Sequence, residues 1–219
     1  MRFAFNALLI VMLSAFSTAA PCDNEALRQY IESQEFRAQL QQFGMQWDRS
    51  IIGKQPDCRD RRLAKPVSFE ELEEVRFGSD DVNPTTGAWL TRFLLDRCGR
   101  TVMYNIVAVA RPVESPKLVR LVPGNTLASA RLMRDVYDQA IPMAGVVEMS
   151  RLGKDYSCEK PVIVEDTEVV RRPEVVNARI TSQWEEVWSV KMCDERVDIR
   201  LCFTPDGNGG TYFSTRPCG

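Results

Sequence analysis

The sequence has 219 residues, of which 44% are hydrophobic, and its 28 basic and 30 acidic side chains leave a net charge of −2 at pH 7. A chain of this length can form two small domains or one fused domain with its own core, while the near balance of charges and the lack of a basic tract argue against nucleic acid as a partner. The sequence contains no histidine, which excludes Ser-His-Asp and Cys-His nucleophiles and zinc sites that use histidine.

Residues 1–20 have the features of a secretory signal peptide. Arg2 supplies the basic start, residues 3–16 form an apolar stretch, and small residues follow. We expect cleavage after Ala19 rather than one residue later, because the later cut would leave Pro21 as the first residue. An uncleaved membrane anchor is the alternative, but the apolar stretch is short for a membrane span. No second apolar run approaches that length, so the sequence predicts a periplasmic or secreted protein with no membrane span after cleavage.

The first predicted helix begins near Asp23 or Asn24, either of which can cap it, and extends to about Trp47. Its apolar residues recur with helical spacing. That spacing slips between Ile31 and Phe36, which indicates either a kink or two shorter helices.

Residues 70–74 contain four glutamates, the densest carboxylate cluster of the chain. Two of them could act as acid and base if burial or repulsion raised one pKa. We favour a solvated edge or turn of the scaffold, because two of these glutamates recur as Glu165 and Glu168 in the second half of the chain. Active sites rarely come in matched pairs.

Alternating apolar residues over 89–95 and 102–108, joined by a turn, predict an antiparallel hairpin. Trp89 lies in its first strand, and Trp184 and Trp188 lie in the corresponding strand of the second half. These tryptophans could form an aromatic surface for a glycan or peptide, but apolar neighbours at alternating positions favour core packing.

A turn at residues 123–126 is expected to cap the second helix, whose apolar residues keep helical spacing up to Ile141. Pro142 is expected to end it. Residues 126–141, moved back by 95 positions, fall inside the first predicted helix, so the helix belongs to the repeated unit.

A second hairpin is predicted over 184–190 and 197–203, followed by a tight turn and a third strand at 211–213. The turn at residues 206–210 has the Asp-x-Asn-x-Gly start of a calcium loop, but the twelfth position, where the bidentate glutamate belongs, is Pro217. Turn chemistry explains the asparagine and the glycines without a metal.

The second half of the chain repeats the first at an offset of 95 residues, with eleven identities in the 43 aligned positions of 65–107 against 160–202. The sequence therefore predicts an α+β fold: a tandem duplication of a helix plus antiparallel β-meander module, disulfide-stapled. We place module 1 at 21–113 and module 2 at 114–219. The linker around 110–117 is short, so we expect the two modules to pack against each other.

All seven cysteines follow the predicted cleavage site, and in an oxidising compartment they are interpreted first as disulfides. The repeat makes Cys98 and Cys193 equivalent, and each has one upstream cysteine near its Lys-Pro-Val sequence. The predicted pairs are Cys58 with Cys98, Cys158 with Cys193, and Cys202 with Cys218. Cys22 paired with either member of the last pair is the alternative, and one thiol is left over in each case.

The second module contains a spaced pattern of aromatic, cysteine and glycine residues: Trp184-x3-Trp188-x-Val190-x2-Cys193, Val197-x-Ile199, Pro205-Asp206-Gly207 and Gly209-Gly210-Thr211. Together with the Pro123-Gly124-x-Thr126 helix start, this pattern resembles exported proteobacterial proteins of uncharacterised function. The resemblance covers most of the second module, its motifs are structural, and it implies no activity.

No catalytic residue, cofactor or metal is expected. The sequence favours a non-enzymatic exported protein that binds another envelope or secreted protein, through two similar faces or through one composite groove between the modules. A carboxylate-only enzyme acting on an envelope glycan would need two acidic residues about 5–9 Å apart in a cleft. A structural or stress-related envelope protein would need no ligand. A large exposed apolar patch at the module junction would favour binding.

Overall fold

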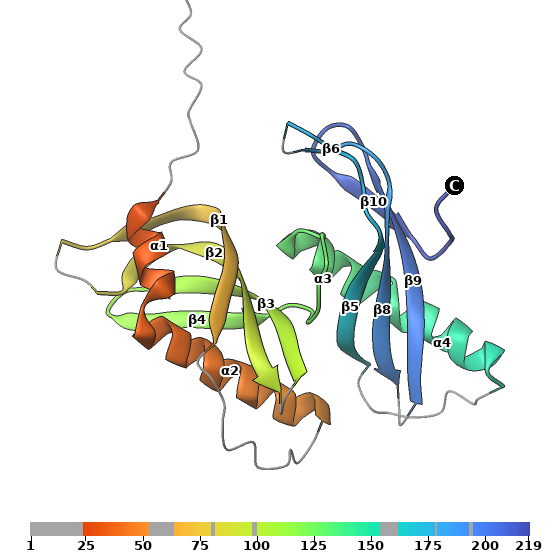
Figure 1. Cartoon of the computed structure of the whole chain (residues 1–219), viewed down its shortest axis with the longest axis horizontal. Helices are drawn as coiled ribbons and strands as arrows, with labels where there is room; N and C mark the ends of the chain where they lie inside the picture. The colour runs from red at the N-terminus through yellow and green to blue at the C-terminus, as the bar shows by residue number, and fades with distance from the viewer. Residues whose placement is uncertain are drawn as a thin grey trace, which may run out of the picture.

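The computed structural model describes residues 24–52, 64–79, 82–97, 100–153, 162–177, 179–192 and 195–219. They form two four-stranded antiparallel sheets, each with helices packed against it, and one two-stranded ribbon (Figure 1). Both larger sheets are meanders, and the ribbon is inserted between the first and second strands of the second one. The predicted α+β class, built from two helix and β-meander modules, is therefore confirmed.

The first module contains α1 (Glu25–Glu32), α2 (Gln34–Ile52), β1 (Lys65–Phe77), β2 (Pro84–Arg97), β3 (Arg100–Arg111) and β4 (Glu114–Arg120). The Asn24 side chain caps α1 by accepting a hydrogen bond from the Leu27 backbone N–H at 3.0 Å. Ser33 has extended backbone and ends α1, and its Oγ accepts from the Phe36 N–H at 3.2 Å. The break expected between Ile31 and Phe36 is therefore present at Ser33.

The second module contains α3 (Ala130–Gln139), α4 (Ile141–Arg151), β5 (Ile163–Arg171), β6 (Val175–Val176), β7 (Arg179–Ile180), β8 (Trp184–Met192), β9 (Glu195–Pro205) and β10 (Thr211–Ser214). Its helix begins at Ala130, where the Ser129 hydroxyl accepts from the Leu132 N–H at 3.3 Å, and not at residue 126 as predicted. α3 ends at Gln139, just before Pro142, as expected. A further helix, α4, follows at once, and Pro142 lies in its first turn, where a proline has no intrahelical N–H to lose.

The division between the modules lies later than the sequence suggested. β4 pairs with β3, from Ile106 opposite Arg120 to Arg111 opposite Glu114, so the expected boundary after residue 113 falls inside a hairpin of the first sheet. The same hairpin recurs 95 residues later, because Val109 faces Lys117 in the first sheet and Thr204 faces Tyr212 in the second. β4 and β10 are therefore equivalent strands, and the chain leaves the first module at residue 121.

The first strand of each sheet does not follow the offset of 95. In the first sheet, Phe69 pairs with Thr91. An offset of 95 would make Val164 the partner of Glu186 in the second sheet. The residue that pairs with Glu186 is instead Val169. The identities over residues 65–76 thus align in sequence but not in sheet register, and irregularities occur along both strands. An edge strand has one partner only, so bulges can change its register without disturbing the rest of the meander.

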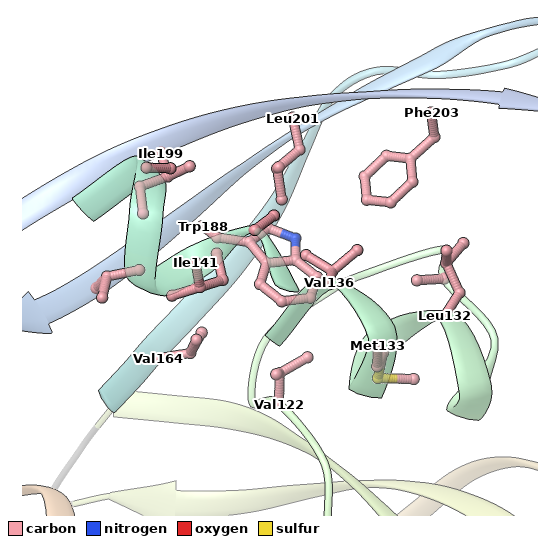
Figure 2. Packing of buried hydrophobic residues seen from close by; sticks show 14 of the residues in the cluster. Val122, Leu132, Met133, Val136, Ile141, Val164, Trp188, Ile199, Leu201 and Phe203 are labelled. Carbon is pink, nitrogen blue, oxygen red and sulfur yellow. The ribbon is translucent and has the colours of Figure 1, made fainter. Parts of the chain in front are cut away.

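The helices and sheets form alternating layers. α1 and α2 cover one face of the first sheet, and α3 lies between the two sheets (Figure 1). Leu90, on the opposite face of β2 from Trp89, belongs to the same buried cluster as α3 and the second sheet. Figure 2 shows Trp188 at the centre of this cluster, close to Val136 and Val164. The modules therefore pack against each other, as the sequence predicted.

A disulfide joins Cys202 of β9 to Cys218 in the C-terminal segment, which confirms one of the three predicted pairs. The pairs Cys58–Cys98 and Cys158–Cys193, like Cys22 and the predicted signal peptide, lie outside the described residues. Among the described helices, none is both long and apolar enough to span a membrane.

Replacing both cysteines of the confirmed disulfide by serine is expected to lower the free energy of unfolding by about 3 kcal/mol, because the 16-residue separation closes a loop of the size for which the chain-entropy model gives that value. Urea unfolding followed by tryptophan fluorescence measures the change. The Cys218→Ser single variant should lose about as much free energy of unfolding as the double variant, because either change removes the bridge. Unchanged stability in the double variant would show that the bridge does not restrain the unfolded chain.

Candidate binding groove between the two modules

Residues 121–129, here called the connecting segment, run from β4 to α3 between the two sheets. On one side the Leu121 and Gly124 N–H groups donate to the Asn105 and Met103 carbonyls at 3.1 and 2.8 Å. On the other side the Asn125 N–H donates to the Thr167 carbonyl at 2.7 Å. The connecting segment is thus hydrogen-bonded to β3 of the first sheet and β5 of the second.

Side chains from both modules fix the connecting segment in place. Asn105 of β3 is fully buried, and its amide donates to the Val122 and Gly124 carbonyls at 2.7 and 3.0 Å. From the other sheet, the Thr167 hydroxyl donates to the Pro123 carbonyl at 2.9 Å. These bonds satisfy carbonyl groups that would otherwise be costly to bury.

Gly124 is needed where the connecting segment passes closest to β5. Its φ of +98° is in the region that favours glycine, and a Cβ there would lie 2.1 Å from the Thr167 nitrogen and 2.5 Å from the Thr167 oxygen. Because both atoms belong to the backbone, no side-chain rotation can relieve the overlap.

Glu186 of β8 is a fully buried carboxylate with four hydrogen-bond donors. Its Oε2 accepts from the Thr126 hydroxyl at 2.7 Å and the Trp188 indole at 2.8 Å. Its Oε1 accepts from the Leu127 N–H and the Trp184 indole, both at 2.9 Å. The second sheet therefore binds the connecting segment through a charge whose oxygens are fully solvated by protein donors.

Arg92 of β2 approaches the connecting segment from the first module. Its guanidinium donates to the Thr126 carbonyl and, at 3.2 Å, to the Ala128 carbonyl. Burial lowers the pKa of Arg92, and the negative charges of Glu70 and Glu186 act in the opposite direction. Thr126 therefore links two opposite charges from different modules, donating to Glu186 and accepting from Arg92.

A groove of about 890 Å³ opens beside this junction, between the outer face of the first sheet and α3. Val107, Val119 and Leu121 supply apolar walls from the first module, and Ile163 continues them at the start of β5. Val109 is 36% exposed in this groove. The two modules together thus form an apolar hollow that neither could form alone.

The exposed charged and aromatic residues of the lining, here called the mouth of the groove, are Arg120, Arg131, Arg134, Tyr137 and Asp138. Arg120 lies over the Trp47 and Phe43 rings, 5.8 and 6.0 Å from their centres, and donates to the Ser50 hydroxyl at 2.8 Å. On α3 the Tyr137 hydroxyl donates to the Val162 carbonyl at 2.8 Å. Burial and the nearby charge of Asp138 raise the pKa of Tyr137, so it remains a neutral hydrogen-bond donor at physiological pH.

A larger hollow, of about 1080 Å³, lies beside α1 and the start of β1. It belongs to one module and much of its lining is charged or polar. Arg37 there donates to the Ala64 carbonyl at 2.8 Å, and Arg28 lies over the Phe69 ring at 5.4 Å. Since these basic groups are already engaged within the fold, we take the groove between the modules as the candidate site.

The glutamate cluster at residues 70–74 lies on the edge strand β1 and away from the groove. Glu71 accepts from the Val75 N–H and so supports an irregular part of the strand. A hydrogen bond from Arg76 at 2.7 Å, together with its charge, lowers the pKa of the exposed Glu74. These roles agree with the scaffold interpretation.

The Asp-x-Asn-x-Gly turn also has a structural role. One oxygen of the Asp206 carboxylate accepts from the N–H groups of Asn208 and Gly210, both at 2.8 Å. Within the part of the chain that the structure describes, no group of three or more His, Cys, Asp or Glu side chains is placed to hold a metal ion.

All four tryptophans are core residues and none forms an aromatic surface. Trp89 and Trp188 are fully buried, and Trp184 and Trp47 are 2% and 4% exposed. The expectation of core packing is confirmed.

Three polar residues of the junction were not recognised from the sequence: Arg92, Asn105 and Glu186. Glu186 carried a usable signal, because it occupies an inward position between two tryptophans in an otherwise apolar alternation. Arg92 and Asn105 occupy positions that look solvent-facing in an isolated hairpin, and they are covered only because the second module packs there.

Comparisons with known proteins give no further guide to this site: no protein-family model, no curated protein and no solved structure matches the chain.

Gly124→Ala is expected to destabilise the protein by at least about 2–3 kcal/mol, because it combines an unfavourable φ with overlap against the β5 backbone. Gly207→Ala is the matched control: its φ is +79°, but a Cβ there meets nothing within 4 Å. Urea unfolding of both variants measures the difference. Equal losses would show that close packing of the connecting segment on β5 contributes nothing.

Glu186→Gln is expected to lower the free energy of unfolding by about 2–4 kcal/mol. The amide would present one acceptor oxygen and two N–H donors to four groups that all donate. Glu114→Gln is the control, since this exposed glutamate pairs with the exposed Arg111 at 2.9 Å and should lower the free energy of unfolding by about 1 kcal/mol or less. Thermal unfolding with near-ultraviolet circular dichroism measures both. Similar losses would contradict a central role for Glu186.

Proposed function

We propose that this protein is an exported binding protein, without catalytic machinery of its own, that holds its partner in the groove between the two modules. The observation that carries this proposal is the composite apolar groove, whose walls come from β3 and β4 on one side and from α3 and β5 on the other. Exposed apolar surface of this kind, held open on a rigid scaffold, is typical of binding sites.

Two further features support export and binding. The N-terminal sequence has the pattern of a cleaved signal peptide, and a disulfide between Cys202 and Cys218 fits an oxidising compartment. The two aspartates of the groove, Asp135 and Asp138, lie about one turn apart on the same helix, and Asp135 is within 3.8 Å of Arg131. They do not form the pair of opposed carboxyl groups that a glycosidase uses.

The test is a pull-down of tagged mature protein from its own cell envelope after light crosslinking, read by mass spectrometry for protein partners and by native mass spectrometry for retained small molecules. Val109→Asp places a charge in the apolar groove and is expected to abolish retention of the partner. Val82→Asp is the control, because Val82 is 72% exposed and lies outside the groove.

A partner retained by the parent protein and by Val82→Asp, but lost from Val109→Asp, supports the proposal. A partner retained equally by all three proteins would place the binding face elsewhere. A parent protein that retains nothing would favour a structural envelope protein without a ligand.

A further inference from the structure

The size of the groove limits what it can hold. At about 890 Å³ it is within the range of sites that bury most of a small organic molecule, about 300–1,000 Å³. Its shape is that of an open hollow beside α3 and the outer face of β3 and β4. The groove therefore suits one small ligand better than the broad surface of a folded partner.

The valine and leucine side chains of the groove wall favour contact with an apolar part of a ligand. Val107, Val119 and Leu121 are half-buried there, so part of their apolar surface still faces water. Covering that surface with hydrocarbon is favourable by about 25 cal/mol per Å². Two of the polar groups in the lining already have partners within the fold: Ser50 accepts from Arg120, and Tyr137 donates to Val162.

The charges at the mouth favour an anionic end. Arg131 is paired with Asp135 at 3.8 Å, whereas Arg120 donates to the uncharged Ser50 hydroxyl. Arg134 is exposed and, within the described residues, makes no ion pair or hydrogen bond. Asp138 is the remaining acidic group of the lining. Arg120 and Arg134, which are not paired to an acid, therefore outnumber the unpaired Asp138. The net charge at the mouth is positive.

The sheet edges beside the groove argue against an extended peptide as the ligand. β4 has Pro116, which lacks an N–H to donate, followed by the charged Lys117, and β5 has irregular register after Val164 and after Val169. Both features make the edges less suited to pairing with a further strand. Side chains, and not a backbone ladder, are therefore the expected means of recognition.

We propose that the groove binds an amphipathic anion of the fatty-acid type, with its hydrocarbon chain along the valine-rich wall and its carboxylate at Arg134. This inference rests on the proposed function and names the ligand class for the same groove. Arg120 contributes positive potential at the mouth, and the Arg134 guanidinium makes the charge-assisted hydrogen bond to the head group.

The experiment titrates mature protein with the fluorescent fatty acid cis-parinaric acid and then displaces the probe with palmitic acid or with hexadecanol. Binding is expected, with palmitic acid displacing the probe at a concentration at least about tenfold lower than hexadecanol. Arg134→Gln should weaken probe binding by about tenfold, since a hydrogen bond to a charged group is lost, and Val109→Asp should abolish binding. Arg111→Gln, an exposed β3 arginine that pairs with Glu114 outside the groove, is the matched control and should bind as the parent does. Circular dichroism establishes that each variant is folded.

Equal displacement by the acid and the alcohol, together with unchanged binding by Arg134→Gln, would overturn the anionic head group while leaving the groove as the binding site. No probe binding, or probe binding that Val109→Asp does not reduce, would overturn the fatty-acid ligand. In that case a protein partner crosslinked to the parent but not to Val109→Asp would still support the proposed function, so the two proposals fail separately.

Discussion

The buried carboxylate of Glu186 organises the junction on which the rest of the structure depends. A buried carboxylate is stable only if both of its oxygens accept hydrogen bonds. The oxygens of Glu186 accept from two indoles of its own sheet and from Thr126 and Leu127 of the connecting segment. Arg92 binds the same segment from the first module. The requirement to satisfy one buried anion therefore fixes the position of the connecting segment, of α3 behind it, and of the groove beside it.

The two copies of the repeated module differ at this point. Thr91 occupies the place of Glu186 in the first copy, and Trp89 that of Trp184. In the part of the chain that the structure describes, the Trp89 indole N–H and the Thr91 hydroxyl have no hydrogen-bond partner. There, α1 covers the tryptophan through Tyr30, whose ring centre lies 6.1 Å from that of Trp89. The first module thus closes its core with aromatic packing, whereas the second closes it with a polar network.

This asymmetry accounts for the groove between the two modules. α1 and α2 cover one face of the first sheet, and part of its other face is left to contact α3. The contact is incomplete: Leu90 is fully enclosed, but Val109 is not. The space left where the covering helix ends is the groove. Its valine walls and its arginines come from elements whose relative position neither module determines alone.

The sequence by itself determined the modules and the burial of their tryptophans. Alternation over 89–95 and 102–108 predicts a hairpin with one face inward, and the slip in helical spacing between Ile31 and Phe36 predicts either a kink or two shorter helices. These are local patterns, so they can be read without knowing the neighbours. The offset of 95 residues correctly related β2 and β3 to β8 and β9. It failed for β1 against β5, since bulges at a sheet edge alter register at little cost.

Only the tertiary structure decided how the modules meet. Arg92 and Asn105 look like surface residues of a hairpin, and residues 123–126 look like a helix cap, until the second sheet is brought against them. Their roles depend on hydrogen bonds between groups distant in sequence, such as Asn105 with Gly124 and Thr126 with Glu186. Periodicity shows which face of an element is buried, but not which other element packs against that face. The groove depends on how the two modules pack together, because its walls meet only when both modules are in place.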